Sequence, residues 1–147
     1  MIAVGPSGAS ENKPFDRLAE LALDLMGADI AIVSLDMSSF WPDRGAITSA
    51  AFRDDGDDMV AAVRSEVRAL AHASHAAERG FELYVEIPLR SEQEQRLGKL
   101  VVLGREARDV GDREIRLLKK LGHVVVDVIE SRVSIDGGSA RHVTPAT

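Results

Sequence analysis

The chain has 147 residues, of which 45% are hydrophobic and 29% charged, and its net charge is −6. This length predicts one domain with a hydrophobic core, and the composition is that of an ordinary globular protein. The acidic balance argues against a nucleic-acid-binding surface, which needs clustered lysine and arginine. The chain has no cysteine, which excludes disulfides, thiolate nucleophiles and cysteine-based metal sites.

Both ends of the chain are expected to be flexible tails, because residues 1–13 and 134–147 are rich in Gly, Ser and Pro and show little periodicity. The domain is then expected at residues 14–133. The N-terminus lacks the basic segment and apolar core of a signal peptide, and no apolar run approaches the ~18 residues that span a bilayer. We therefore expect a cytoplasmic protein with no membrane contact.

The first half of the domain predicts a helix followed by two strands. Apolar residues recur at helical spacing from Phe15 to Met26, Pro14 suits the first turn of a helix, and Gly27 suits its end. Residues 28–37 are apolar and rich in β-branched side chains, which predicts a strand. A weaker strand is expected at residues 46–52, and the two would form a hairpin.

The second half predicts a helix, a second hairpin and a last helix. Residues 57–79 have one apolar face and end at Gly80, which predicts a single helix after the acidic turn at 54–58. Apolar and polar residues alternate from Phe81 to Arg90, and a second strand ends at Gly104. Residues 109–133 predict the last helix.

Pro88 lies within the first strand of this second hairpin. Because proline has no N–H to donate to a ladder, we expect it at an edge or near the end of the strand, with its nitrogen turned away from a neighbour. Glu82, Tyr84, Glu86 and Arg90 share its face, which should be the wetter one. The apolar row from Phe81 to Leu89 should pack under helices.

The order of helix, two strands, helix, two strands and helix predicts an α+β fold. We expect the N- and C-terminal helices on one face of an antiparallel sheet, with the central helical segment beside or over the sheet.

Several segments resemble the GAF family of sensory domains. VEIPLR at 85–90, RLGKLVVL at 96–103 and the last helix match its C-terminal half, where a strand ending in Pro-Leu leads to an Ile/Leu-Gly-x-Leu strand and a helix with a Leu-Leu step. FDRLAELALDLMGADIAIVSL at 15–35 is similar to its opening helix and strand. The resemblance covers residues 15–132 and implies a GAF-like fold with a sensory or regulatory role. The interval at 54–80 is shorter than in typical members, where loops and small helices close over the ligand.

The resemblance also implies candidate ligands. Family members bind cyclic nucleotides, bilins, haem or small effectors, and a few reduce methionine sulfoxide; the bilin and reductase chemistries need cysteine, which this chain lacks. Imidazole is a common ligand of haem iron, and His72 and His75 would lie one above the other on a helix, although a helix end also suits histidine. Two histidines do not fill a zinc site, so no metal is expected. The candidate ligand-pocket residues are Phe40, Trp41, His72, His75 and Tyr84.

The last helix is apolar over a wider arc than packing on one sheet face requires, which favours a partner helix from a second copy. The alternative is a helix that is simply well buried. The candidate dimer-helix residues are Leu117, Leu121, Val124 and Val128.

These features predict a non-enzymatic sensory or regulatory domain that binds an unknown small-molecule effector. It would transmit the signal through the packing of terminal helices in a homodimer to a downstream signalling protein. No cofactor is expected, and a haem-based sensor is a distant alternative. A ligand-free dimerisation or protein-interaction scaffold is the closer alternative, and the shortened middle segment favours it.

Overall fold

The computed structural model describes the backbone at residues 4–36, 45–53 and 63–137, and the side chains at residues 13–36, 45–53 and 63–131. Its elements in chain order are α1 (Val4–Met26), β1 (Ile30–Asp36), β2 (Ala46–Phe52), the short 3-10 helix η1 (Arg64–Glu66), α3 (Val67–Leu70), α4 (Ala73–Glu78), β3 (Leu83–Arg90), β4 (Arg96–Gly104) and α5 (Asp112–Gly137).

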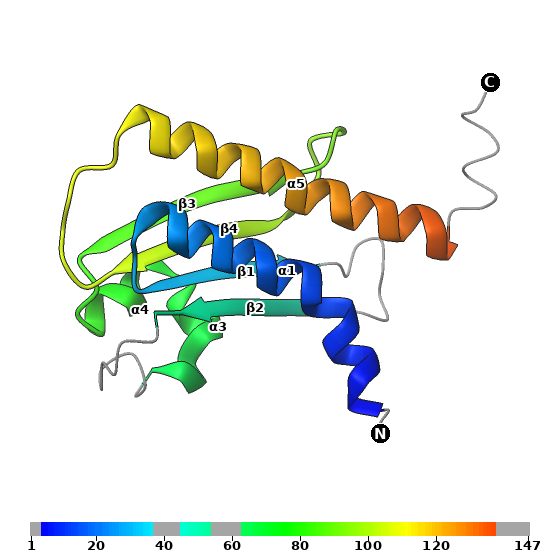
Figure 1. The fold of residues 1–147 in the computed structure, drawn as a ribbon, viewed down its shortest axis with the longest axis horizontal. Coiled ribbons are helices and arrows are strands. Elements are labelled where there is room, and N and C mark those ends of the chain that lie inside the picture. Colours follow the sequence, from blue (N-terminus) through cyan, green and yellow to red (C-terminus); the bar gives the residue numbers. More distant parts are fainter. Residues whose placement is uncertain (1–3, 37–44, 54–62, 138–147) are drawn as a thin grey trace.

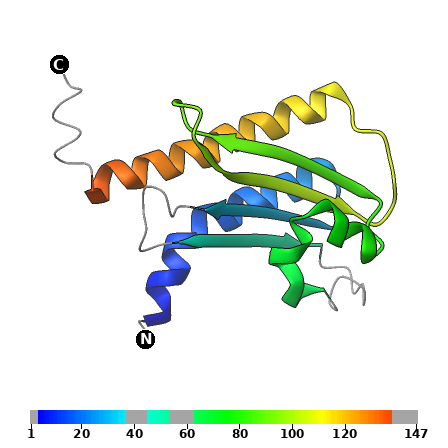
Figure 2. The same cartoon turned by 180° about the vertical axis from the view of Figure 1, so that it is seen from behind.

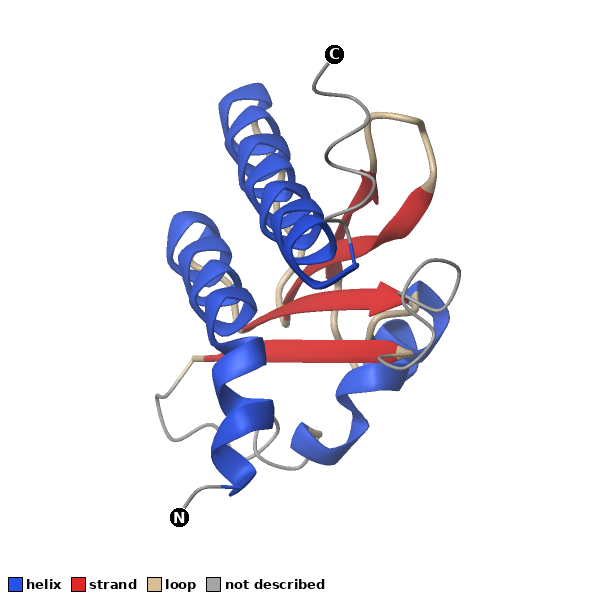
Figure 3. Cartoon of the chain, turned by 90° about the vertical axis from the view of Figure 1, so that its right-hand side faces the viewer, coloured by secondary structure: helices blue, strands red, loops and turns tan. Residues whose placement is uncertain are grey.

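The four strands form one antiparallel sheet in the order β2-β1-β4-β3. α1 and α5 lie side by side on one face of the sheet, called here the inner face (Figure 1). η1, α3 and α4 lie against the opposite, outer face, and Figure 3 shows the long and the short helices on different sides of the strands. The architecture is the α+β fold expected from the sequence, and it is consistent with a GAF-like fold.

Each face of the sheet has its own hydrophobic cluster, because successive side chains of a strand point to opposite faces. On β1, Ala31 and Val33 point to the inner face, and Ile30 and Ile32 point to the outer face. The inner cluster is the larger and joins α1 and α5 to the sheet. The outer cluster comprises Ile30, Ile32, Val63, Leu70, Ala71, Ala76, Phe81, Val101 and Leu103.

Gly98, the glycine of the RLGKLVVL segment, lies where β4 closely approaches β1. It pairs with Leu35 and has a φ of +155°, which side chains rarely adopt. A Cβ atom added here would overlap the carbonyl oxygen of Ser34 and lie 2.9 Å from Leu35 Cα. The glycine is therefore required by the close approach of two backbones.

The expectation for Pro88 is confirmed. β3 is the last strand in the sheet order and Pro88 lies in its second half, opposite Lys99 of β4. On the wetter face Glu86, Pro88 and Arg90 are exposed, whereas Ile87 and Leu89 are buried in the inner cluster. Phe81 differs from the prediction: it precedes β3 and packs in the outer cluster with α3 and α4.

The terminal helices are longer than predicted. α1 begins at Val4 and α5 ends at Gly137, so residues 4–13 and 134–137 are helical and not tails; residues 138–147 lie outside the described residues. Pro14 is inside α1 instead of in its first turn, and the ribbon bends in this part of the helix (Figure 1). A formed helix extends through residues that carry no apolar periodicity, because propagation costs less than nucleation.

The central segment is not the single helix that its periodicity predicts. Residues 54–62 lie outside the described residues, and from Arg64 onward the chain forms η1, α3 and α4, with an extended residue, His72, between α3 and α4. In a continuous helix Ala71 O would accept the N–H of His75. In the structure the Tyr84 hydroxyl lies 2.9 Å from Ala71 O, so a contact with β3 replaces the helical bond. Figure 2 shows these short helices at one end of the sheet.

Candidate functional site

Tyr84 joins the outer helical layer to the sheet. Its hydroxyl lies 2.9 Å from Ala71 O and 2.7 Å from Glu86 Oε1, and both atoms are acceptors. Burial, and next the bond to Glu86, raises the pKa of Tyr84, so the phenol stays protonated at neutral pH. The same hydrogen bond lowers the pKa of Glu86, and the charges of Lys99 and Arg96 lower it further.

These side chains form a polar group on the outer face, beside the outer cluster. Lys99 Nζ lies 3.6 Å from Glu86 Oε1 although its side chain is only 14% exposed, and Arg96 Nη2 lies 3.8 Å from Glu86 Oε2. The group consists of one acid between two bases and a protonated phenol. Its charges and its phenol can position a polar ligand.

The two candidate histidines have different surroundings. His75 Nε2 lies 2.7 Å from Glu66 Oε1, which Arg79 Nε also approaches to 2.7 Å. The bond from His75, and then the bond from Arg79, lowers the pKa of Glu66. His72 is exposed and precedes α4 in an extended conformation. Binding iron through His75 Nε2 would cost the contact with Glu66.

The remaining pocket candidates, Phe40 and Trp41, lie outside the described residues. Between the sheet and α3–α4, the described apolar side chains of the outer cluster pack against one another. Among all the residues that the structure describes, no group of three or more His, Asp or Glu side chains could hold a metal ion. No helix within these described residues is long and apolar enough to cross a membrane.

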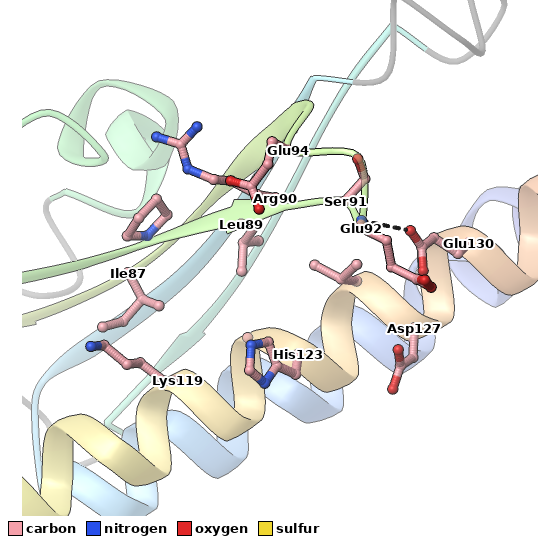
Figure 4. Close-up of a pocket in the computed structure, with 13 residues that line it drawn as sticks. Ile87, Leu89, Arg90, Ser91, Glu92, Glu94, Lys119, His123, Asp127 and Glu130 are labelled. Carbon is pink, nitrogen blue, oxygen red and sulfur yellow. Dashed lines mark hydrogen bonds between the residues drawn. The ribbon is translucent and has the colours of Figure 1, made fainter.

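A groove of about 480 Å³ lies between α5 and the end of β3 (Figure 4). Its apolar floor consists of Ile87, Leu89 and Val126. Gly122 of α5 lets the helix approach the strand, because a Cβ atom there would lie 3.0 Å from Leu89 Cδ2. Charged side chains from the hairpin and from α5 form the rim of this groove, which we call the α5–β3 groove.

A second pocket, of about 430 Å³, lies at the C-terminal end of α1 and is lined by Arg53, Arg105 and Arg108. Two of these arginines bind the last carbonyls of the helix: Arg53 Nη2 lies 2.6 Å from Gly27 O, and Arg108 Nη2 lies 2.7 Å from Met26 O. Cations are favourable at this end of a helix dipole. These contacts stabilise the C-terminal end of α1.

Arg108 also reaches the first turn of α5, where its Nη2 lies 3.1 Å from Glu114 Oε2. Glu114 Oε1 accepts the backbone N–H of Gly111, which is the glutamate half of a capping box. The bonds from Arg108 and from Gly111 lower the pKa of Glu114. Arg108 therefore connects the end of α1 to the start of α5.

The candidate dimer residues recur along α5 at spacings of four, three and four residues, which is coiled-coil spacing. Val124 is 43% exposed, and Leu117, Leu121 and Val128 are half-buried. Leu121 and Val128 also pack against the inner cluster of their own chain. On the neighbouring helix, Leu21 is 52% exposed.

No family model matches the chain, and no curated protein matches it. A solved structure does: a domain of a protein described as a two-component sensor histidine kinase, from Sinorhizobium meliloti 1021. The TM-score is 0.57 at 13% sequence identity, and the match covers 89% of this chain and 97% of that chain. The fold is shared. At this identity the likeness extends to the fold alone.

The sequence offered Tyr84 and the α5 stripe as candidates, and these stay predictions, whereas it did not indicate the α5–β3 groove or the arginines at the end of α1. The groove combines alternate residues of β3 with residues of α5, and nothing in either segment indicates how closely the two approach. Gly122, inside an otherwise apolar helix face, is the one signal that pointed there. Arg108 lies in a charged loop and carries no local signal.

Proposed function

We propose that this chain is a non-enzymatic sensory or regulatory domain that forms a homodimer through α1 and α5. The observation that carries the proposal is the exposure of Leu21 and Val124 on two adjacent helices that form one layer. Large exposed apolar side chains on a helical layer are typical of an interface. The shared fold with a domain from a sensor histidine kinase supports the regulatory role.

A second copy is the occupant that fits this surface best. The Leu117–Val128 stripe is partly satisfied by the chain itself, so a partner helix would bury the remaining area without competing for the whole core. Identical stripes on two copies are self-complementary about a two-fold axis. A shift in the packing of the two α5 helices would then be the signal that a downstream protein reads.

Light scattering coupled to size-exclusion chromatography tests the dimer. We expect a dimeric mass for the full chain and a monomeric mass for the double variant Leu21→Gln, Val124→Gln. The matched control is Ala77→Gln, which places the same side chain on an exposed position of α4. A monomeric parent chain, or a double variant that stays dimeric, would sink the proposal.

The effector is expected on the outer face, at the group formed by Tyr84, Glu86 and Lys99. A ligand bound there would contact both β3 and the short helices that Tyr84 tethers. A thermal-shift screen with nucleotides, amino acids and other metabolites tests this part, because a ligand that binds the native state raises the melting temperature. The shift should disappear in Lys99→Gln.

A ligand-free scaffold is the second candidate, and the apolar packing beneath α3 and α4 favours it. A stable dimer together with a flat thermal-shift screen would select the scaffold over the sensor. For the distant haem alternative, purified chain that shows no Soret band after haem addition would eliminate it.

A further inference from the structure

We infer that the α5–β3 groove binds short linear peptides with free termini, with the peptide carboxylate toward Lys119 and the peptide ammonium toward Glu130. This peptide binding goes beyond the proposed function and does not depend on it. Only the further idea that the peptide is the effector would rest on the proposed function. The groove volume of about 480 Å³ is within the range of small-ligand sites.

The groove lies at the outer edge of the sheet. Ile87 and Leu89 point to the inner face of β3, and Pro88 and Arg90 point to the outer face, yet all four line the same groove. Residues from both faces can meet in one groove only along the edge of the strand. In the described sheet, β4 is the one neighbour of β3.

An edge strand offers backbone hydrogen-bonding groups to an added peptide. This favours a peptide over other linear compounds, because a peptide supplies matching amide groups along its length. Pro88 interrupts the row of donors, which disfavours a long added strand and is compatible with a short segment. The apolar floor formed by Ile87, Leu89 and Val126 would receive the side chains of the peptide.

The charges at the rim are ordered along α5. In the view of Figure 4, Lys119 lies at one end with Ile87, His123 lies between, and Glu130 lies at the other end near Glu92. Glu130 Oε2 is 3.5 Å from the backbone nitrogen of Glu92, and Asp127 adds a second acid on the same part of α5. Within the part of the chain that the structure describes, no ion pair neutralises Lys119 or Asp127. A cation at one end of the groove and two acids at the other are complementary to the two terminal charges of a zwitterionic peptide.

The length of the groove sets the size of the peptide. At 1.5 Å per residue, the rise along α5 is about 16 Å from Lys119 to Glu130 and about 10 Å from His123 to Glu130. An extended tetrapeptide spans about 13 Å. Four residues therefore bring the two terminal charges within side-chain reach of Lys119 and Glu130.

The test is an NMR titration of the ¹⁵N-labelled full chain with the tetrapeptide Ala-Leu-Val-Ala. We expect saturable shifts of the Leu89 and Val126 amides, and no saturable shifts with the N-acetylated, C-amidated peptide. Lys119→Gln and Glu130→Gln should each weaken binding about two- to five-fold, which is the range for solvent-exposed ion pairs. Lys120→Gln, the exposed neighbour outside the groove, and Glu78→Gln on α4 are the matched controls and should leave the affinity unchanged.

Three results would overturn the inference: no saturation, equal binding of the capped peptide, or equal effects of Lys119→Gln and Lys120→Gln. A fourth is loss of the dimer in Lys119→Gln or Glu130→Gln, because the groove would then hold a second copy. Mass measurement on the same samples keeps the two proposals separate. A monomer that binds the free peptide at Leu89 and Val126 retains this inference and rejects the proposed dimer.

Discussion

The two helical layers cover the sheet in different ways. The inner layer consists of α1 and α5, with 23 and 26 residues, and the outer layer contains α3 and α4, with four and six. Helices this short are not stable alone, so the outer layer depends on its contacts with the sheet. The inner layer leaves Leu21 and Val124 exposed, whereas the outer layer is held to the sheet by the outer cluster.

The difference indicates where the molecule can respond. Elements with few buried contacts open at a lower free energy than the core. The outer layer is attached by the outer cluster and by Tyr84, so we expect it to open without unfolding the inner layer. Each of the following changes probes one layer, or the sheet between them, in order of decreasing expected effect.

Gly98→Ala should have the largest effect, because Gly98 lies in the sheet that both layers share. The new Cβ atom would overlap Ser34 O and meet Leu35 Cα at a φ of +155°. Overpacking and backbone strain together predict a loss of about 3 kcal/mol or more in the free energy of unfolding. Urea denaturation measures this loss, and Gly45→Ala, with positive φ but open space around it, is the control. Equal losses would show that the close approach is not the cause.

Leu118→Ala and Leu70→Ala compare the two layers directly. Both side chains are fully buried, Leu118 in the inner cluster and Leu70 in the outer cluster. Removing Leu118 should lower the global free energy of unfolding by about 2–5 kcal/mol. Removing Leu70 should have a smaller global effect and should speed hydrogen exchange mainly at the amides of α3 and α4.

The comparison fails if Leu70→Ala lowers the global stability as much as Leu118→Ala and leaves local exchange unchanged. That outcome would mean that the outer layer unfolds together with the rest of the domain.

Much of the fold could be predicted because its signals are local. The alternation around Pro88 and the helical spacing from Phe15 to Met26 each record which side of an element meets the core. The prediction of one helix for the central segment was wrong, because the apolar periodicity is helical on both sides of His72. The break between α3 and α4 depends on Tyr84, which lies on a strand elsewhere in the chain. Sequence periodicity carries no information on such a distant partner.

The candidate sites were predicted less well, because they depend on distances between elements. Tyr84 was identified as an aromatic on the wetter face of β3, but its contact with Ala71 O requires the three-dimensional arrangement. The α5–β3 groove exists because Gly122 allows a helix and a strand from separate segments to meet. Neither its volume nor the order of its charges is visible in either segment alone.

Tyr84→Phe should have a smaller effect than the core changes, about 1 kcal/mol, because it removes one hydrogen-bonding hydroxyl and keeps the ring. The loss should appear as faster hydrogen exchange in α3 and α4, since Ala71 O would lose its partner on β3. If exchange increases equally in α5, the hydroxyl does not act on the outer layer selectively.

The smallest expected effects are those of acid, and they too can be assigned to one layer. Glu114 belongs to the inner layer and Glu66 to the outer layer, and in the folded chain both have pKa values below the ordinary 4.5. A carboxylate with a lowered folded pKa stabilises the folded state above its unfolded pKa, and this contribution is lost as the pH falls through the folded pKa. Urea midpoints measured from pH 7 to pH 3 should therefore fall less steeply below about pH 5 in Glu114→Gln and in Glu66→Gln than in the parent chain.

Hydrogen exchange separates the contributions of the two glutamates. Acid should loosen α3 and α4 through the Glu66–His75 contact, and the start of α5 through the Glu114–Arg108 contact. An acid slope unchanged in both variants would mean that these pairs are too exposed to contribute.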